Sequence, residues 1–206
     1  MTVSRLTSND YRTSRWSGGE TTELVIWPRD AVYGQRDFLF RVSSATVELE
    51  ESTFTALPDY HRLIATLEGT ITLRHDGGAP LTLAPYQVHA FDGGSETVSL
   101  GRCRDFNLML RKGKSVGSLT ALTADAKPLS VPLDQATAFA LLFCAEGRCT
   151  VTVDGVAYGL SSGESLSLEA PAACPCWCST STTPPTSKEP CWAYFLVDKL
   201  VTDRTI

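Results

Sequence analysis

One short segment of the 206-residue chain carries an arginine in a setting that suits anion recognition. Residues 53–69 read TFTALPDYHRLIATLEG, with Arg62 next to His61 and close to Asp59. A guanidinium is permanently charged and donates hydrogen bonds from a planar fork, so it suits a carboxylate and repels a divalent cation. Two interpretations are open: Arg62 points inward and forms an anion pocket, or it lies at the surface and pairs with Asp59 or Asp105.

A second segment, residues 104–110 (RDFNLML), alternates polar and apolar side chains. In a strand, Asp105, Asn107 and Met109 would share one face. A polar pair with an apolar neighbour suits a pocket wall, and it also suits the solvent face of an outer strand. Asp105 and Asn107 are therefore candidate ligand-binding residues.

Arg41 and two aromatic residues complete the candidate pocket. In residues 38–47 (FLFRVSSATV), Arg41 shares a strand face with small residues. It would be a second anion donor there, although an exposed arginine fits the same pattern. Trp16 and Phe54 would form an apolar lid for an aromatic ligand, or they belong to the ordinary core.

The three histidines do not form a recognisable metal-binding pattern. A site built from His61, His75 and His89 would need distorted geometry, because metal sites offer three or four convergent ligands. His75 precedes an Asp-Gly turn, so we expect it to be solvated, and His61 would face away from Arg62 in a strand. The pocket is predicted to hold no metal and no cofactor.

The seven cysteines are an odd number, which argues against a disulfide framework. Cys174, Cys176, Cys178 and Cys191 would offer four thiolates to zinc. Their C-x-C-x-C spacing differs from the C-x2-C knuckles of structural zinc sites, so free thiols are favoured.

Short β-rich runs broken by Gly, Pro and Asp dominate the sequence; they cover residues 21–28, 38–49, 61–77, 79–93, 96–101 and 105–113. No window shows the long period of an amphipathic helix. This spacing is typical of a sandwich or a barrel. The predicted fold is all-β, with few short helices.

Two segments of the chain resemble each other. Residues 67–77 (LEGTITLRHDG) align without a gap on residues 145–155 (AEGRCTVTVDG), at a constant offset of 78. The identical pairs are Glu68/Glu146, Gly69/Gly147, Thr72/Thr150, Asp76/Asp154 and Gly77/Gly155. Each copy reads as strand, Asp-Gly turn, strand. The collinear matches indicate an internal duplication, with residues 112–136 as the connection.

Composition excludes several classes of partner. The net charge is -5 and no cluster of lysines and arginines offers a phosphate-tracking stripe, so we expect no nucleic-acid binding. The N-terminal segment has no apolar core of a secretory signal, and no apolar run approaches the length of a membrane span. A cytoplasmic location is expected.

The duplicated pattern resembles that of a bicupin. Cupins carry G-x5-H-x-H-x3,4-E-x6-G, and with Gly69 as the last glycine the position of the metal-binding glutamate falls on Arg62. The histidine positions fall on residues 55–58, and neither these nor the second copy, counted from Gly147, offers a ligand set. This register favours Arg62 as a pocket residue. His89 lies within one residue of a ligand position in the second cupin motif.

Longer stretches resemble the HutD/Ves family of bicupin proteins. The stretches RWSGGETTELVIWP, FLFRVSSATVE, STFTALPDYHRLIATLEG, HAFDG and CRDFNLMLRKG follow in the order and spacing of that family. The likeness is close over residues 16–112 and rests on pattern alone beyond them. The family's Pro-Gly-x-Asp-Arg reads PDYHR at residues 58–62 here, which differs at two positions.

The resemblance implies a non-catalytic binder, associated in part with bacterial histidine utilisation, that senses or buffers a carboxylate such as urocanate or a formylated glutamate. The family's arginine corresponds to Arg62, its Asp-Phe-Asn to residues 105–107, and its N-terminal Trp and Glu to Trp16 and Glu23. Cupins often pair through edge strands, so a homodimer is compatible with the resemblance.

We therefore predict a bicupin whose domains are residues 1–115, with the pocket, and residues 116–206, a filled structural partner. The last strand of the second copy carries Cys191, Ala193 and Phe195 where the first has its Asp-Phe-Asn face. The predicted function is metal-free binding of a small anionic metabolite, with a regulatory or buffering role. Nine residues are predicted to bind the ligand: Arg62, His61, Asp105, Asn107, Arg41, Trp16, Glu23, Phe54 and His89. Two alternatives remain. One is an enzyme, which uses a metal at His61 or His89, or Asp105 and a histidine as acid and base; the other is a purely structural scaffold.

Overall fold

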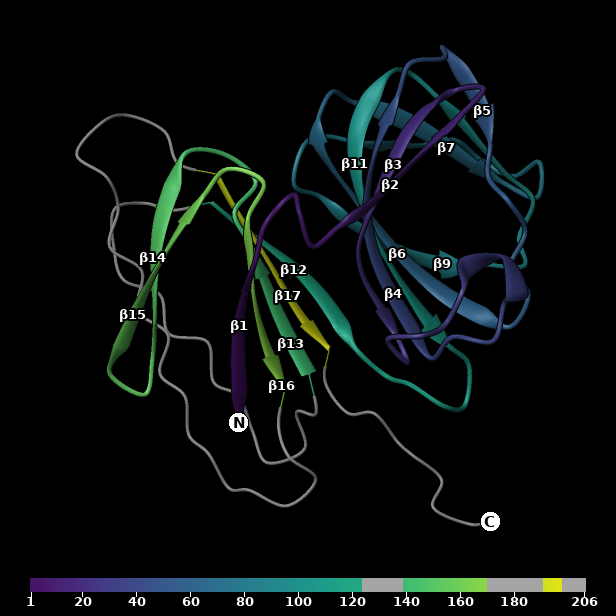
Figure 1. Ribbon diagram of the computed structural model, residues 1–206. Helices are drawn as coiled ribbons and strands as arrows, with labels where there is room; N and C mark the ends of the chain where they lie inside the picture. Colours follow the sequence, from purple (N-terminus) through teal and green to yellow (C-terminus); the bar gives the residue numbers. More distant parts are fainter. Residues whose placement is uncertain (124–138, 170–190, 198–206) are drawn as a thin grey trace, which may run out of the picture. The chain divides into compact units, whose positions relative to one another are not determined.

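The computed structural model describes residues 1–123, 139–169 and 191–197. Within these ranges the protein is all-β, as predicted, apart from the short 3-10 turn η1 (Tyr33–Gln35). The chain divides into two compact units. The N-terminal unit covers Tyr11–Val116, and the C-terminal unit combines Met1–Asp10 with the described residues from Gly117 onward (Figure 1).

Two antiparallel sheets face each other in the N-terminal unit (Figure 1). The six-stranded sheet has the order β2 (Arg12–Trp16), β3 (Gly19–Trp27), β4 (Phe40–Val47), β11 (Cys103–Arg111), β6 (Tyr60–Glu68) and β9 (Val88–Asp92). The four-stranded sheet has the order β5 (Glu51–Thr53), β10 (Thr97–Leu100), β7 (Ile71–His75) and β8 (Leu81–Leu83). The sheets are not closed, so the pair of tandem barrels stays a prediction.

The core of this unit lies between the two sheets. Val47 and Ile64 from the larger sheet pack with Ile71, Leu73 and Leu83 from the smaller one. Inward-facing apolar residues alternate with outward-facing polar ones along β7, which reads ITLRH, because successive side chains of a strand point to opposite faces. The same alternation places the polar side chains of the candidate site.

The C-terminal unit contains one five-stranded sheet and one hairpin. The sheet has the order β1 (Thr2–Leu6), β16 (Ser165–Glu169), β13 (Phe139–Phe143), β17 (Cys191–Val197) and β12 (Ser118–Thr123). The hairpin joins β14 (Arg148–Val153) to β15 (Val156–Ser161). Its apolar face packs with β13 and β16 in one cluster that includes Leu142, Val151, Leu160 and Leu166. Strand β12 lies inside the segment that the sequence indicates as a connection.

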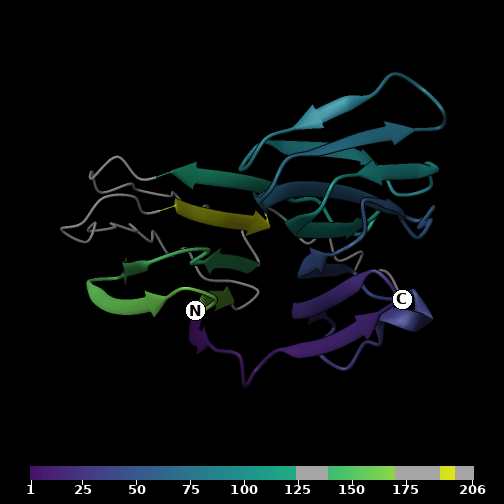
Figure 2. The same cartoon turned by 90° about the horizontal axis from the view of Figure 1, so that it is seen from above.

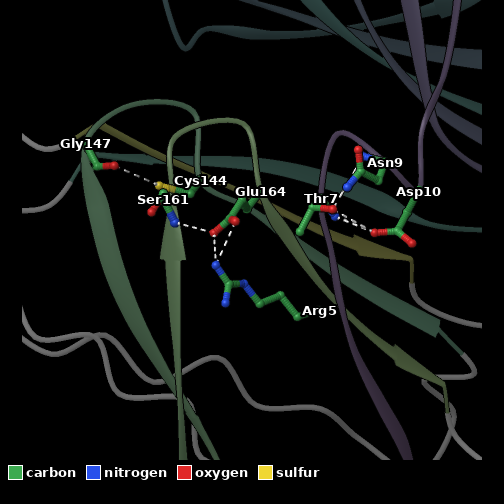
Figure 3. Close-up of polar contacts among 8 residues, drawn as sticks. All are labelled: Arg5, Thr7, Asn9, Asp10, Cys144, Gly147, Ser161 and Glu164. Carbon is green, nitrogen blue, oxygen red and sulfur yellow. Dashed lines mark hydrogen bonds and ion pairs between the residues drawn. The ribbon is translucent and has the colours of Figure 1, made fainter.

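The first ten residues contribute to the C-terminal unit. Strand β1 pairs with β16 from Thr2↔Glu169 to Leu6↔Ser165, and Figure 2 shows it beside the green strands of that unit. Arg5 donates from Nη2 to both carboxylate oxygens of Glu164 at 2.7 Å (Figure 3). The division into residues 1–115 and 116–206 stays a prediction, and β1 is the element that departs from it, because its partner strand is distant in sequence.

The backbone of the two repeat copies is alike at their turns. Gly69 and Gly147 have φ angles of +80° and +73°, and Asp76 and Asp154 have φ angles of +51° and +48°. A Cβ at position 69 would lie 2.5 Å from the carbonyl oxygen of Arg102, so only glycine fits there. Equivalent turns at a constant offset support the duplication. None of the helices that the structure describes is long and apolar enough to cross a membrane.

Candidate functional site

A cavity of about 330 Å³ opens in the N-terminal unit, between strands of the larger sheet and the segment that follows β5. Its lining includes six of the predicted ligand-binding residues: Trp16, Arg41, Phe54, Arg62, Asp105 and Asn107. The remaining lining residues are Ser14, Thr21, Tyr33, Ser43, Ala45, Val47, Ser52, Thr53, Thr55 and Met109. The volume is in the range of small-molecule sites.

Strand alternation explains which side chains reach this cavity. On β11, Asp105, Asn107 and Met109 point into it, and on β4 Arg41 and Ser43 do so. Met109 stands opposite Arg62 of β6 on one side and opposite Arg41 of β4 on the other. The two arginines therefore flank the same position of the central strand.

A hydrogen-bonded row of side chains crosses the cavity wall. Arg62 donates from Nη2 to Oδ1 of Asn107 at 2.9 Å, and Nδ2 of Asn107 donates to Oδ1 of Asp105 at 2.7 Å. A guanidinium only donates and a carboxylate only accepts, so the orientation of the Asn107 amide is fixed by its two neighbours. The row thus runs from a cation to an anion through one amide.

Arg62 is buried and only partly satisfied. Its exposed fraction is 6%, and its Cζ lies 4.8 Å from the ring centre of Phe54 and 5.1 Å from that of Phe91. Its Nε–H is buried without a hydrogen-bond partner. Burial lowers the pKa of Arg62, yet a guanidinium keeps its proton in proteins. A buried guanidinium that lines a cavity suits a bound anion, because it offers charge-assisted hydrogen bonds.

Arg41, in contrast, is neutralised within the protein. It donates from Nε to Oε2 of Glu23 at 2.7 Å and from Nη1 to Oγ of Ser43 at 3.2 Å, and its Cζ lies 4.2 Å from the ring centre of Tyr33. Glu23 does not line the cavity, and its carboxylate forms an ion pair with Arg41. The charge balance of the cavity therefore depends mainly on Arg62 and Asp105.

Asp105 is buried and lines the cavity. Burial raises the pKa of its carboxyl group from 3.8 to about 6, and Arg62, the Ala45 backbone N–H and the Asn107 amide partly offset this rise. The hydrogen bonds from Ala45 N, at 3.2 Å, and from Asn107 both end on Oδ1. With a pKa near 6, this carboxyl group is an ionised hydrogen-bond acceptor above that pH and a neutral acid, able to donate, below it.

The histidines lie away from the cavity lining. His61 is exposed on the opposite face of β6 from Arg62, as strand alternation predicts. The expectation that His75 is solvated is wrong: its side chain is half-buried, and its Nε2 lies 3.0 Å from Nε2 of His89. Both rings pack on Phe91, which in turn contacts Arg62.

One arrangement of protons satisfies this histidine pair in its neutral form. The hydroxyl of Thr97 donates to the Ser95 carbonyl at 3.2 Å, so its oxygen accepts from Nδ1–H of His75 at 2.8 Å. Nε2 of His75 is then an acceptor for Nε2–H of His89. Burial lowers the pKa of both imidazoles, which favours this uncharged pair.

The cavity does not fit the divalent cation that cupin-like folds often hold. The cupin glutamate position carries the cationic Arg62, and no three His, Cys, Asp or Glu side chains converge among the residues that the structure describes. Cys103, Cys144 and Cys149 are buried free thiols. Cys174, Cys176 and Cys178 and the side chain of Cys191 lie outside the described part of the protein.

Sequence patterns missed Tyr33. It sits in η1, where no strand period applies, and it lines the cavity between the guanidinium groups of Arg36 and Arg41, whose Cζ atoms lie 3.9 Å and 4.2 Å from its ring centre. The equivalent of Arg62 in the second copy, 78 residues on, is Ala140, which is 1% exposed within the hydrophobic cluster of the C-terminal unit. That cluster has no counterpart of the charged row.

Comparisons with known proteins agree with this fold. The model of the HutD family matches residues 8–183. Among solved structures, a conserved protein of unknown function from Pseudomonas aeruginosa PAO1, PA5104, is 26% identical with a TM-score of 0.82 and covers 97% of this chain and 100% of its own.

Two further structures share the fold at lower identity. HutD from Pseudomonas fluorescens SBW25, solved in a formate condition, is 24% identical with a TM-score of 0.73, and the match covers 96% of this chain and 100% of that one. A cupin 2 conserved barrel domain protein from Leptotrichia buccalis is 15% identical with a TM-score of 0.56, and the match covers 95% and 96% of the two chains. No curated protein matches the chain.

Proposed function

The chain belongs to the HutD family of cupin-like proteins associated with histidine utilisation, and on this premise we propose that its N-terminal cavity binds a small carboxylate. Binding would give the protein a regulatory or buffering role for a metabolite of that pathway. We also propose that the two duplicated copies form a bicupin in which only the first copy binds a ligand. The contrast between Arg62 and Ala140 supports this division.

The observation that carries the proposal is the buried guanidinium of Arg62, which lines the cavity and makes one side-chain hydrogen bond, to Asn107. One guanidinium edge is used by Asn107, while Nε has no partner in the free protein. A ligand carboxylate in the cavity would neutralise the charge of Arg62 and accept a charge-assisted hydrogen bond from its guanidinium. Phe54 and Trp16 add apolar surface for a planar ligand.

Thermal unfolding with urocanate or N-formylglutamate tests the proposal directly. At a concentration a hundredfold above Kd, a ligand adds roughly 2.7 kcal/mol of stability, which raises Tm by about 5–10 °C for a chain of this size. Arg62→Met should abolish the shift, and Arg62→Lys should weaken it because an ammonium cannot form the fork. Arg74→Met, at an exposed arginine of β7, is the matched control. A shift that survives in Arg62→Met would reject the proposed site.

A second candidate function is acid–base chemistry on a bound carboxylate. It is favoured by the pKa of Asp105, which burial raises to about 6 and so places close to the range of general bases. Proton exchange would be followed by NMR of urocanate in D2O with wild-type protein and with Asp105→Asn. Exchange catalysed only by the wild type would support an enzyme, and an unchanged spectrum would leave binding as the function.

A further inference from the structure

The cavity wall has opposite charges at its two ends. Arg62 and Arg41 flank Met109 at one end of the central strand, and Asp105 lies four residues away on the same face of β11. Four residues of a strand span roughly 13 Å along the backbone, but the charged groups are closer than that, because a single amide separates the Arg62 guanidinium from the Asp105 carboxylate. Asn107 lies between them and joins Arg62 to Asp105. The wall is therefore polar along its length, with positive charge at one end and negative charge at the other.

From this arrangement we infer that Asp105 is a specificity-determining residue, whose carboxylate accepts a hydrogen bond from an N–H or O–H group at the end of the ligand opposite its carboxylate. The ligand class is thus a small carboxylate that carries a hydrogen-bond donor at its far end. The inference rests on the proposed function, because Arg62 must hold the ligand carboxylate first.

The contacts of Asp105 support this role. Both hydrogen bonds that the carboxylate accepts from described residues end on Oδ1, which leaves Oδ2 as the oxygen for a ligand. The side chain lines the cavity and is 4% exposed, so a donor that reaches it would replace little bulk water. Asp105 also repels any second carboxylate at that end, so it selects against anions there.

The charge compensation at the other end explains why the ligand binds in one direction. Arg41 is paired with Glu23 at 2.7 Å, whereas Arg62 reaches Asp105 only through the Asn107 amide. A ligand carboxylate is therefore attracted to Arg62 and repelled from Asp105. A hydrogen-bond donor at the far end of the ligand then lies toward the carboxylate of Asp105. A site built to pair such a donor strongly rejects an analogue that lacks it.

Two isosteric probes separate this inference from simple anion binding. Urocanate has an acrylate arm and an imidazole ring with an N–H group, and furylacrylate has the same arm and a five-membered ring without N–H. Their Kd values would be measured by isothermal titration with wild-type protein at about pH 8, where Asp105 is ionised. Wild type should bind urocanate about tenfold or more tightly than furylacrylate.

Asp105→Asn should bring the ratio of the two Kd values close to one while furylacrylate still binds, because Arg62 is intact. Asp59→Asn, at an exposed turn, is the matched control and should keep the wild-type ratio. Equal affinities in wild type, or a ratio unchanged in Asp105→Asn, would overturn the role of Asp105. If wild type binds neither urocanate nor furylacrylate, the proposed function itself is overturned. Equal affinities in wild type would overturn the inference even if Asp105→Asn does not fold.

Discussion

Arg62 donates to Asn107 at 2.9 Å while its Nε–H stays buried without a partner. The guanidinium is thus held in place by one edge and unsatisfied at another. This arrangement costs the free protein stability, because an unmade hydrogen bond of a buried charged group is expensive. On the proposed function, a ligand carboxylate that neutralises Arg62 would offset part of this cost.

Asp105→Asn is expected to change how the stability of the protein depends on pH. The folded pKa of Asp105, about 6, exceeds the ordinary value of 3.8, so the folded state holds this proton more tightly than the unfolded state. The free energy of unfolding therefore falls as pH rises from about 4 to about 6, by up to roughly 3 kcal/mol. Urea unfolding of wild type and variant across this window should show wild type losing stability relative to the variant. If the free energies of unfolding of wild type and variant change with pH in parallel, the raised pKa of Asp105 is contradicted.

Arg62→Met should widen that pH window. Arg62 lowers the pKa of Asp105, so its removal raises that pKa above about 6. The variant should be nearly as stable as wild type at about pH 5, where Asp105 is protonated in both, and distinctly less stable at about pH 8. The double variant with Asp105→Asn should lose this extra dependence. Denaturant midpoints at the two pH values measure the effect; an equal loss at both would mean that the residues do not interact.

The histidine pair is expected to give a slope of the opposite sign. Burial lowers the pKa of His75 and His89 below 6.5, so the unfolded state binds more protons than the folded state just below that pH. Stability should therefore fall as pH drops below about 6.5. His89→Phe keeps a ring beside Phe91 and should flatten this slope, whereas His61→Phe, on the exposed face, should not. Tm measured against pH for the two variants distinguishes them.

Glu23→Gln should destabilise the protein far more than Glu20→Gln does. Both glutamates lie on β3 and pair with an arginine, but Arg41 and Glu23 are 7% and 12% exposed while Arg15 and Glu20 are 83% and 40% exposed. Removing one partner of a buried pair costs about 3–5 kcal/mol, and an exposed pair contributes about 1 kcal/mol or less. Chemical denaturation of the two variants provides the comparison. Equal losses would show that Arg41 does not depend on Glu23.

The strand faces were predictable because they follow from a period of two. The sequence places Asp105, Asn107 and Met109 on one face, and the structure turns that face to the cavity. The inward direction of Arg62 came from the cupin register, because composition alone allowed a surface arginine equally well. Local pattern and family register together therefore located six of the sixteen residues that line the cavity.

The remaining features depend on contacts between distant parts of the chain. The pairing of His75 with His89 depends on how β7 and β9 meet across the unit, and the pairing of Arg41 with Glu23 depends on the register of neighbouring strands. Tyr33 lies in a turn without a period. No local pattern specifies which of these side chains meet, since meeting is decided by packing.

The contrast between Arg62 and Ala140 has an evolutionary consequence. The described apolar cluster of the C-terminal unit is constrained mainly by volume, because cores accept many apolar substitutions that preserve volume. The half with the charged row is constrained by the type of each polar residue, because one replacement leaves its neighbour buried and unpaired. The apolar cluster can therefore accept substitutions that the charged row cannot, and on the proposed function a change of ligand would begin in the N-terminal unit.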